Sequence, residues 1–234
     1  MARILSFGVA PCNSNLRMAA QIIFVTGTDT GVGKTVFAAL LTRYLRTQGL
    51  RVAALKPLGT GNHDDARALR IAAGKILRLD EVNPWHFRAP LTPLLAARKE
   101  RKRVRLREVI AHVRRVKKRF EVVVVEGAGG LLSPLGEGFD SRDLIVALRA
   151  KPIVVCPNRL GAVNQVLLVL NALPRAVAAW TPVVLVSPRR PDHASRTNPR
   201  LLAEILGARR VRVFPWLRKL KAGRARTACA PQPA

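Results

Sequence analysis

The stretch VTGTDTGVGKT, residues 25–35, decides how the rest of the chain is interpreted. It overlaps the apolar run QIIFVTG, residues 21–27, which predicts a buried strand, and it leads into an amphipathic segment that predicts a helix over residues 34–49. A strand that passes through a glycine-rich loop into a helix is the context of a phosphate-binding loop. Thr28 occupies the position where the commonest form, G-x-x-x-x-G-K-[ST], has its first glycine. The loop is therefore a variant of that motif.

Each part of this loop has an expected role in binding a nucleotide. Two glycines let the backbone come close to the phosphates, and the helix N-terminus adds its dipole. Lys34 supplies a charge that can follow a transferred phosphoryl group, and the Thr35 hydroxyl can bind Mg²⁺. We expect the backbone of the loop to bind the β- and γ-phosphates through Gly31, Val32, Gly33, Lys34, Thr35 and Val36.

The remaining chain alternates continuous apolar runs with segments of helical periodicity. This pattern is typical of an α/β fold, and predicts a P-loop NTPase-type, mostly parallel β-sheet with helices on both faces. Strands are expected at residues 21–27, 51–58, 120–127, 152–158, 181–187 and 211–217. Helices are expected at residues 34–49, 64–77, 104–119, 141–148, 163–173 and 198–207, and the proline-interrupted segment 82–97 is expected to be a loop that leads into a short helix.

Composition divides the chain into three parts. Residues 21–217 are predicted to form a single P-loop domain, preceded by a disordered extension (1–20) and followed by a basic, flexible tail (218–234). Three scattered cysteines have neither metal-ligand nor disulfide-framework spacing, which favours a reducing, cytoplasmic setting. No apolar run reaches the roughly 20 residues that a membrane span needs.

Polar residues stand where three predicted strands or helices meet the carboxyl edge of the sheet, where ligands of α/β proteins bind. Lys56 ends the second strand, in KPLGTG, and can hold an anionic acceptor against the γ-phosphate. Asp64 and Asp65 begin a helix, and Glu126 leaves the most hydrophobic strand in the chain, VVVVE. Mg²⁺ is the obvious partner for a carboxylate in so apolar a place. The alternatives are a surface lysine, a helix cap and an ion-paired carboxylate.

Taken together, these motifs resemble the dethiobiotin synthetase family. The likeness runs in order from about residue 21 to residue 217, and the glycine spacing of the first motif is specific to that family. It is carried by GTDTGVGKT, KPLGTG, HDDARAL, VNPWHFRAPLTP, VEGAGGLLSPL, LGAVNQVLL and PWL.

The resemblance implies an ATP-dependent carboligase. Such an enzyme joins CO2 to 7,8-diaminononanoate as a carbamate, phosphorylates the carbamate from ATP and closes the ureido ring, which gives dethiobiotin, ADP and phosphate. It implies that Lys56, Lys34 and Thr30 are catalytic and that Thr30, Lys56, Thr60 and Asn164 bind substrate, with Asn164 acting across a homodimer interface.

The resemblance also implies a metal site and a nucleotide site. Thr35, Asp65 and Glu126 match the family's Mg²⁺ positions. Besides the phosphate loop, the expected nucleotide contacts are Asp65, Glu126, Gly127, Ala128, Gly129, Ser187, Pro188, Pro215, Trp216 and Leu217.

The chain departs from the family pattern where the adenine should bind. Ser187 and Pro188 stand where the family usually has an Asn-Asp pair, and basic residues replace the acidic residue expected shortly after Trp216. A triphosphate is the expected ligand, whereas the preference for ATP is not fixed by these residues. A homologue that binds nucleotide without making dethiobiotin is therefore a further alternative.

The balance of charge is strongly basic. Arg and Lys total 41 against 14 acidic residues, a net charge of +27, and the densest run is residues 98–120. Such a charge attracts polyanions. The run is also an amphipathic helix whose cations need only be a solvated face, and aromatic residues are few, so a nucleic-acid partner is the less favoured interpretation and stays open as an alternative. The rival function is a partition- or maturation-type P-loop ATPase switch, but Asp29 stands where such proteins usually carry a second lysine.

Overall fold

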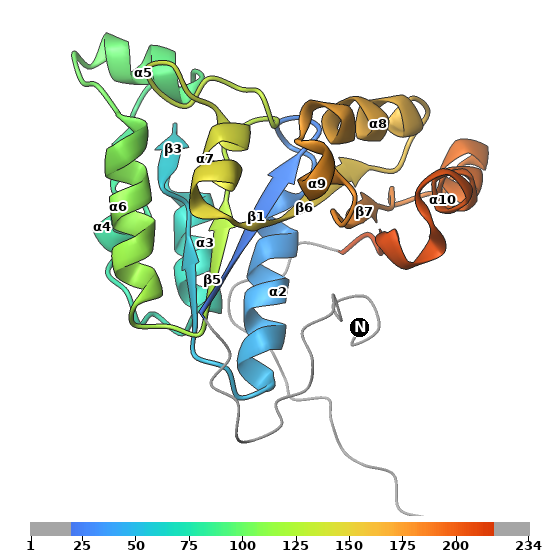
Figure 1. Ribbon diagram of the computed structural model, residues 1–234, viewed down its shortest axis with the longest axis horizontal. Coiled ribbons are helices and arrows are strands. Elements are labelled where there is room, and N and C mark those ends of the chain that lie inside the picture. The colour runs from blue at the N-terminus through green and yellow to red at the C-terminus, as the bar shows by residue number, and fades with distance from the viewer. Residues whose placement is uncertain (1–19, 218–234) are drawn as a thin grey trace, which may run out of the picture.

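The computed structural model describes residues 20–217, and its core is one parallel sheet. Apart from residue 20, the predicted N-terminal extension lies outside the described residues, and so does the predicted tail, residues 218–234. Within the described residues, six strands pair in the order β2-β5-β1-β6-β7-β8, and every pairing is parallel (Figure 1). The strands are β1 (Gln21–Gly27), β2 (Val52–Leu55), β5 (Val122–Glu126), β6 (Lys151–Pro157), β7 (Val183–Val186) and β8 (Val211–Phe214).

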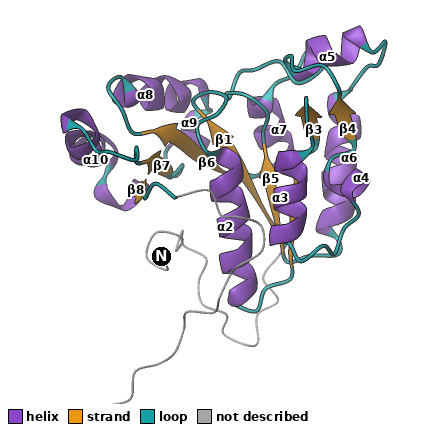
Figure 2. Cartoon of the chain, turned by 180° about the vertical axis from the view of Figure 1, so that it is seen from behind, coloured by secondary structure: helices purple, strands orange, loops and turns teal. Residues whose placement is uncertain are grey.

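The strands are apolar along their whole length because helices cover both faces of the sheet. Phe24 and Val25 of β1 and Val123, Val124 and Val125 of β5 are completely buried. Helices α2 (Lys34–Thr47) and α3 (Asp64–Ala72) lie on one face, and α6 (Leu106–Lys117), α7 (Ser141–Leu148) and α8 (Ala162–Ala172) lie on the other (Figures 1 and 2). The predicted fold class is confirmed.

The second predicted strand is shorter than expected. It ends at Leu55 instead of residue 58, because the next residue leaves the sheet: the Lys56 amide donates to the Val82 carbonyl. Beyond Pro57 the chain forms β3 (Leu58–Thr60), which pairs in parallel with β4 (Trp85–Phe87) in a second, two-stranded sheet. The expected loop at 82–97 thus contains a strand, followed by the short helix α5 (Pro93–Lys99).

Helix boundaries differ from the prediction where local backbone signals override periodicity. Helix α3 ends at Ala72 instead of residue 77, because Gly74 and Lys75 both adopt positive φ angles and so terminate the helix. Helix α10 (His193–Leu206) begins five residues earlier than residue 198, because the Asp192 side chain accepts a hydrogen bond from the Ser195 amide and caps it.

The sequence pattern also missed three short segments. The segments without a prediction are α4 (Leu79–Val82), α9 (Arg175–Ala178) and the 3₁₀ turn Ala208–Arg210. No helix among the described residues is long and apolar enough to cross a membrane.

Candidate active site

The parallel sheet brings the predicted functional residues to one edge. Strands β2, β5 and β1 are adjacent, so their carboxyl ends deliver Lys56, Glu126 and the phosphate loop side by side. Helix α3 packs on both α2 and β2 and places Asp65 above the same point. The structure therefore brings together Lys34, Thr35, Lys56, Asp65 and Glu126.

The phosphate loop has the backbone that its glycines allow. Gly31 and Gly33 have φ angles of 73° and 97°, a conformation that side-chain-bearing residues rarely adopt. Gly33 is the N-cap of α2 and supplies no side-chain acceptor, so the first amides of the helix remain available to an anion. The Lys34 ammonium donates to the Asp29 carbonyl at 2.6 Å. Without a ligand, the loop thus binds its own lysine.

Lys56 is the centre of a buried ion-pair network. Its Nζ lies 2.6 Å from Asp65 Oδ2 and 2.7 Å from Glu126 Oε1, and the side chains of Lys56 and Glu126 are only 10% and 1% exposed. The side-chain amide of Asn83 donates from Nδ2 to the Lys56 backbone carbonyl at 2.7 Å and fixes the backbone at this position. These contacts differ from both alternatives raised by the sequence, in which Lys56 is a surface lysine and Asp65 only caps a helix.

Glu126 also joins the network to the phosphate loop. The Thr35 hydroxyl donates to Glu126 Oε1 at 2.8 Å. The second carboxylate oxygen, Oε2, is buried and has no hydrogen-bond partner among residues 20–217. A buried, unpartnered carboxylate oxygen is costly unless something positive occupies the space beside it. The predicted ion-paired alternative for Glu126 accounts for one oxygen only.

These residues fit a magnesium ion. Mg²⁺ is usually bound through one or two carboxylates, with water and substrate phosphates completing its shell, so an all-protein cage is not required. Thr35, Asp65 and the unpartnered oxygen of Glu126 offer that kind of donor set. The described residues contain no cluster of three or more His, Cys, Asp or Glu side chains that could hold a metal ion.

Burial and neighbouring charges shift three pKa values at this site. Burial lowers the pKa of Lys34 to about 8, because the carboxylates around it compensate only in part. Burial acts to lower the pKa of Lys56, but the opposing effect of Glu126 and Asp65 is larger, so the pKa of Lys56 is raised above its ordinary value. Burial acts to raise the pKa of Asp65, yet Lys56 outweighs it and holds the pKa below the usual range. Lys56 and Asp65 are therefore fully charged near neutral pH.

The remaining predicted substrate residues surround this network at different distances from its centre. Thr30 is exposed on the phosphate loop and faces Gly129, where an added Cβ would lie 3.8 Å from its hydroxyl. Thr60 ends β3 and is half-buried. Asn164 is exposed on α8, and the described contacts do not join it to the Lys56 network.

The segments expected to contact the base meet at the ends of β7 and β8. The Ser187 amide donates to the Phe214 carbonyl at 2.8 Å, which places Ser187 and Pro188 beside Pro215, Trp216 and Leu217. The Arg189 guanidinium lies over the Trp216 ring, 5.7 Å from its centroid. An added Cβ at Gly33 would lie 3.4 Å from Val186, so the phosphate loop borders this segment.

A histidine pair beside the site was not predicted from the sequence. The rings of His63 and His86 stack with centroids 3.5 Å apart, and both Nδ1 atoms are buried without a hydrogen-bond partner among the described residues. Burial and the neighbouring His63 ring lower the pKa of His86. The contact depends on the β3–β4 pairing, so no signal in the sequence pattern indicated it.

Nearly the whole described chain is similar to one protein-family model and to curated proteins that share one name. Residues 21–224 match a family model described as an AAA domain. The chain is 39% identical over 199 residues to a protein of Anaeromyxobacter sp. (strain K) named ATP-dependent dethiobiotin synthetase BioD, covering 83% of this chain and 89% of that protein. It is 33% identical to the protein of that name from Bacillus subtilis (strain 168), covering 83% of this chain and 87% of the relative.

Among solved structures, pNOB8 ParA bound to nonspecific DNA is similar, with a TM-score of 0.53 and 12% sequence identity over 88% of each chain. At that level of identity the likeness concerns the fold alone, which is that of P-loop NTPases.

Proposed function

The chain belongs to the ATP-dependent dethiobiotin synthetase family, and we propose that it converts 7,8-diaminononanoate, CO2 and ATP into dethiobiotin, ADP and phosphate in biotin biosynthesis. The enzyme is an ATP-dependent cyclo-ligase. The observation that carries the proposal is Lys56, which is held between two carboxylates directly beside the phosphate loop. A loop that only switched between nucleotide states would not require a buried lysine at that position.

The chemistry divides into three steps, and positioning is the main contribution of the protein to each. The lone pair of one amine of the diamine forms a bond to the carbon of CO2, the amine nitrogen loses one proton to solvent, and a carbamate anion results. A carbamate oxygen attacks the γ-phosphorus of ATP, the bond to the bridging oxygen breaks, and ADP leaves. The second amine then attacks the carbonyl carbon, the C–O bond to the phosphate breaks, and the ureido ring closes with loss of one proton.

In this scheme the lysines neutralise charge that develops during phosphoryl transfer. Lys56, whose pKa is raised, stays charged and holds the carbamate anion against the γ-phosphate. Lys34 leaves the Asp29 carbonyl and follows the transferred phosphoryl group. Thr30 of the phosphate loop and Thr60 at the end of β3 orient the diamine, and the backbone of Glu126–Gly129 borders the nucleotide.

We propose that Thr35, Asp65 and Glu126 hold Mg²⁺. The ion would supply charge neutralisation between the β- and γ-phosphates. The unpartnered Oε2 of Glu126 supports this assignment, since it is a buried acceptor that no protein donor reaches. Ser187, Pro188 and Trp216 would contact the base without the amide and carboxylate groups that read adenine, so discrimination between ATP and other triphosphates is expected to be weak.

A homodimer with substrate sites shared across its interface is also proposed. Asn164 is exposed on α8, flanked by Leu160 and Leu168, which are 82% and 60% exposed. Asn164 and Leu168 are four residues apart on α8 and share one side of the helix, whereas Leu160 precedes its N-cap, Gly161. Large exposed apolar side chains close to one another favour an interface. We also propose a cytoplasmic enzyme, because its substrates are small metabolites of the cell interior.

The ATPase-switch alternative is less well supported. The curated relatives carry the synthetase name, and Asp29 contributes its carbonyl to Lys34 at the place where a switch protein would present a second lysine. Likeness to a DNA-bound ParA concerns the fold only.

The test is Mg²⁺-dependent ADP release with and without the diamine and bicarbonate, with dethiobiotin followed by mass spectrometry. We expect ADP and dethiobiotin to form in equal amounts. ADP release that ignores the diamine, or that DNA stimulates, would contradict the proposal. Replacing ATP by CTP or GTP in the same assay measures how strongly the base is selected.

A further inference from the structure

A basic hollow lies at the edge of the sheet opposite the active site. It has a volume of about 560 Å³ and sits between the C-terminal turns of α6 and α7 and the first residues of β1 and β6. Its floor includes the buried side chains of Ile22 and Leu148. The lining consists of Ala20, Gln21, Ile22, Arg114, Lys117, Leu148, Arg149 and Lys151.

The hollow concentrates positive charge without a counter-charge. Four of its lining residues are cations and none is acidic. Among the described residues, no carboxylate forms an ion pair with any of the four: Arg114 donates to the Ala147 carbonyl at 3.0 Å and Lys151 to Gln21 Oε1 at 3.1 Å. Cations gathered in this way repel one another, so an anion that binds among them relieves the repulsion.

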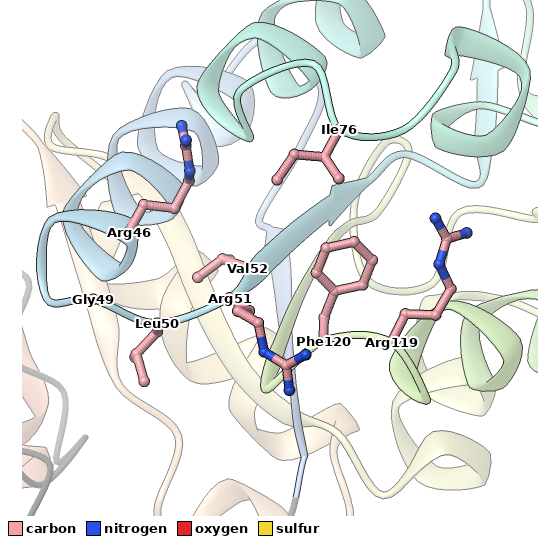
Figure 3. Close-up of a pocket in the computed structure, with 8 residues that line it drawn as sticks. All are labelled: Arg46, Gly49, Leu50, Arg51, Val52, Ile76, Arg119 and Phe120. Atoms are coloured by element: carbon pink, nitrogen blue, oxygen red, sulfur yellow. The ribbon is translucent and has the colours of Figure 1, made fainter. Parts of the chain in front are cut away.

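A second hollow of 480 Å³ on the same edge shows that basic lining alone is not unusual. It is lined by Arg46, Arg51 and Arg119 together with apolar residues (Figure 3). There, Arg51 lies 3.6 Å from Glu121, and Arg119 lies 3.0 Å from Glu81. Carboxylates of the protein already neutralise two of the arginines in that hollow, so it attracts an external anion less strongly.

The dipoles of the two helices explain part of the basic lining but not all of it. Cations near a helix C-terminus are favourable, which accounts for Arg114 and Lys117 in the last turn of α6. Lys151 begins a strand, so no helix dipole acts on it in this way. Arg149 is the C-cap of α7, where the helix dipole also favours a cation, but its φ of 48° and ψ of 43° are the left-handed conformation that favours glycine at a helix end.

We propose that this hollow binds a small anion with several negative charges, of the oligophosphate class. Its volume falls in the usual range of small-molecule sites, roughly 300–1,000 Å³. Lysine ammonium and arginine guanidinium groups are the side chains that proteins use to bind phosphate. A hollow lined by four cations suits a compact anion better than the phosphate backbone of a duplex, which requires an extended surface. Binding here leaves the catalytic edge of the sheet free.

The test is calorimetric titration of the full chain with tripolyphosphate while saturating ADP fills the phosphate loop. The hollow variant combines Lys117→Gln with Arg149→Asn, because asparagine tolerates the left-handed backbone without a charge. A matched control, Lys99→Gln with Arg103→Gln, removes the same charge from exposed positions outside the hollow. We expect one saturable site in the unmodified protein and in the control, and affinity at least about tenfold lower in the hollow variant.

Three outcomes would overturn the proposal. Equal weakening in the hollow variant and the control would mean that net charge alone attracts the anion. Loss of binding in Lys34→Ala, with the hollow intact, would assign tripolyphosphate to the phosphate loop. Binding of a 20-base-pair DNA duplex that depends on the hollow cations, without saturable binding of tripolyphosphate, would replace the small anion by a nucleic acid. ADP release with the diamine serves as the independent readout of folding, since the hollow lies outside the catalytic machinery.

Discussion

The two edges of the sheet carry charge in opposite ways. At the carboxyl edge, Lys56 and Glu126 are almost inaccessible to solvent and lie 2.7 Å apart, and each charge has a partner fixed by the fold. At the amino edge, Arg114, Arg149 and Lys151 are exposed and form no ion pair with a carboxylate in the part of the chain that the structure describes. Removing one partner of a buried ion pair strongly lowers the stability of a protein, whereas an exposed charge contributes about 1 kcal/mol or less to it. The comparison therefore predicts large effects at one edge and small ones at the other.

The largest effect is expected from Lys56→Ala. Without the ammonium, nothing holds the carbamate anion against the γ-phosphate, and dethiobiotin formation should fall by about a thousandfold or more. ADP binding should be nearly unchanged, because the phosphate loop is intact. Product is measured by mass spectrometry and ADP binding by calorimetry.

This variant needs a stability control, because it leaves Glu126 buried without its cation, which costs about 3–5 kcal/mol. Thermal unfolding shows whether the variant is still folded at the assay temperature. Lys99→Ala, which removes an exposed lysine, should leave both turnover and stability close to those of the unmodified protein. Full turnover in folded Lys56→Ala would remove this lysine from the mechanism.

Glu126→Gln sharpens the comparison through the metal. The amide keeps the size of the side chain but removes the charge, so the Mg²⁺ concentration for half-maximal ADP release should rise by about 10–100-fold. Glu121→Gln at the amino edge is the matched control, because its carboxylate pairs with exposed Arg51 at 3.6 Å. An unchanged Mg²⁺ requirement in Glu126→Gln would exclude this residue from the metal site.

A smaller, graded effect is expected from pH. Because burial lowers the pKa of Lys34 to about 8, the ligand-free loop loses its positive charge above that pH. The Kd for ADP should therefore rise by up to about tenfold per pH unit above pH 8. Lys34→Arg, whose guanidinium stays charged, should bind ADP with little pH dependence. A flat profile for the unmodified protein would mean that Lys34 remains charged throughout.

The same shift acts on stability with a definite sign. Between pH 8 and pH 10.5 the unfolded chain still holds the Lys34 proton that the folded chain has released. The unfolded state then binds more protons, so the free energy of unfolding rises with pH across this window, by at most about 3 kcal/mol. Comparing ligand-free protein with Lys34→Met isolates the contribution, since methionine does not titrate.

The smallest effect is expected at the amino edge. Arg149→Gly relieves a left-handed backbone that side-chain-bearing residues adopt at a cost, so it should stabilise the protein by about 1 kcal/mol. A gain of that size raises Tm by roughly 2–4 °C in a domain of this length. ADP release should not change. A lower Tm would show that the Arg149 side chain makes a net favourable contribution despite its backbone.

Periodicity and glycine spacing predicted the sheet well because they report directly on what a parallel strand and a phosphate loop require. The run VVVVE could only be a strand buried on both faces, and it became β5. The failures have two causes: some elements are too short to show a period, and some boundaries depend on contacts between residues that are far apart in the sequence. Strands of three residues, such as β3 and β4, contain no measurable period, and the contact that ends β2 joins Lys56 to Val82, far away in sequence.

The composition of the site was more predictable than its contacts. The position of Lys56 at a strand end and of Glu126 after an apolar strand placed both at one edge. That a single ammonium pairs with both carboxylates depends on where α3 packs, which no local pattern encodes. The His63–His86 stack was missed for the same reason, because it requires the pairing of two short strands.

The order of the strands has a consequence for the chain during its synthesis. The central strand β1 pairs only with β5 and β6, whose first residues come about 100 and 130 positions later in the sequence. At roughly 5–20 residues per second, the ribosome needs on the order of ten seconds to deliver those partners. Through this interval the apolar strand that carries the phosphate loop has no partner strand, so its pairing is delayed for longer than strand pairing in a protein built from hairpins.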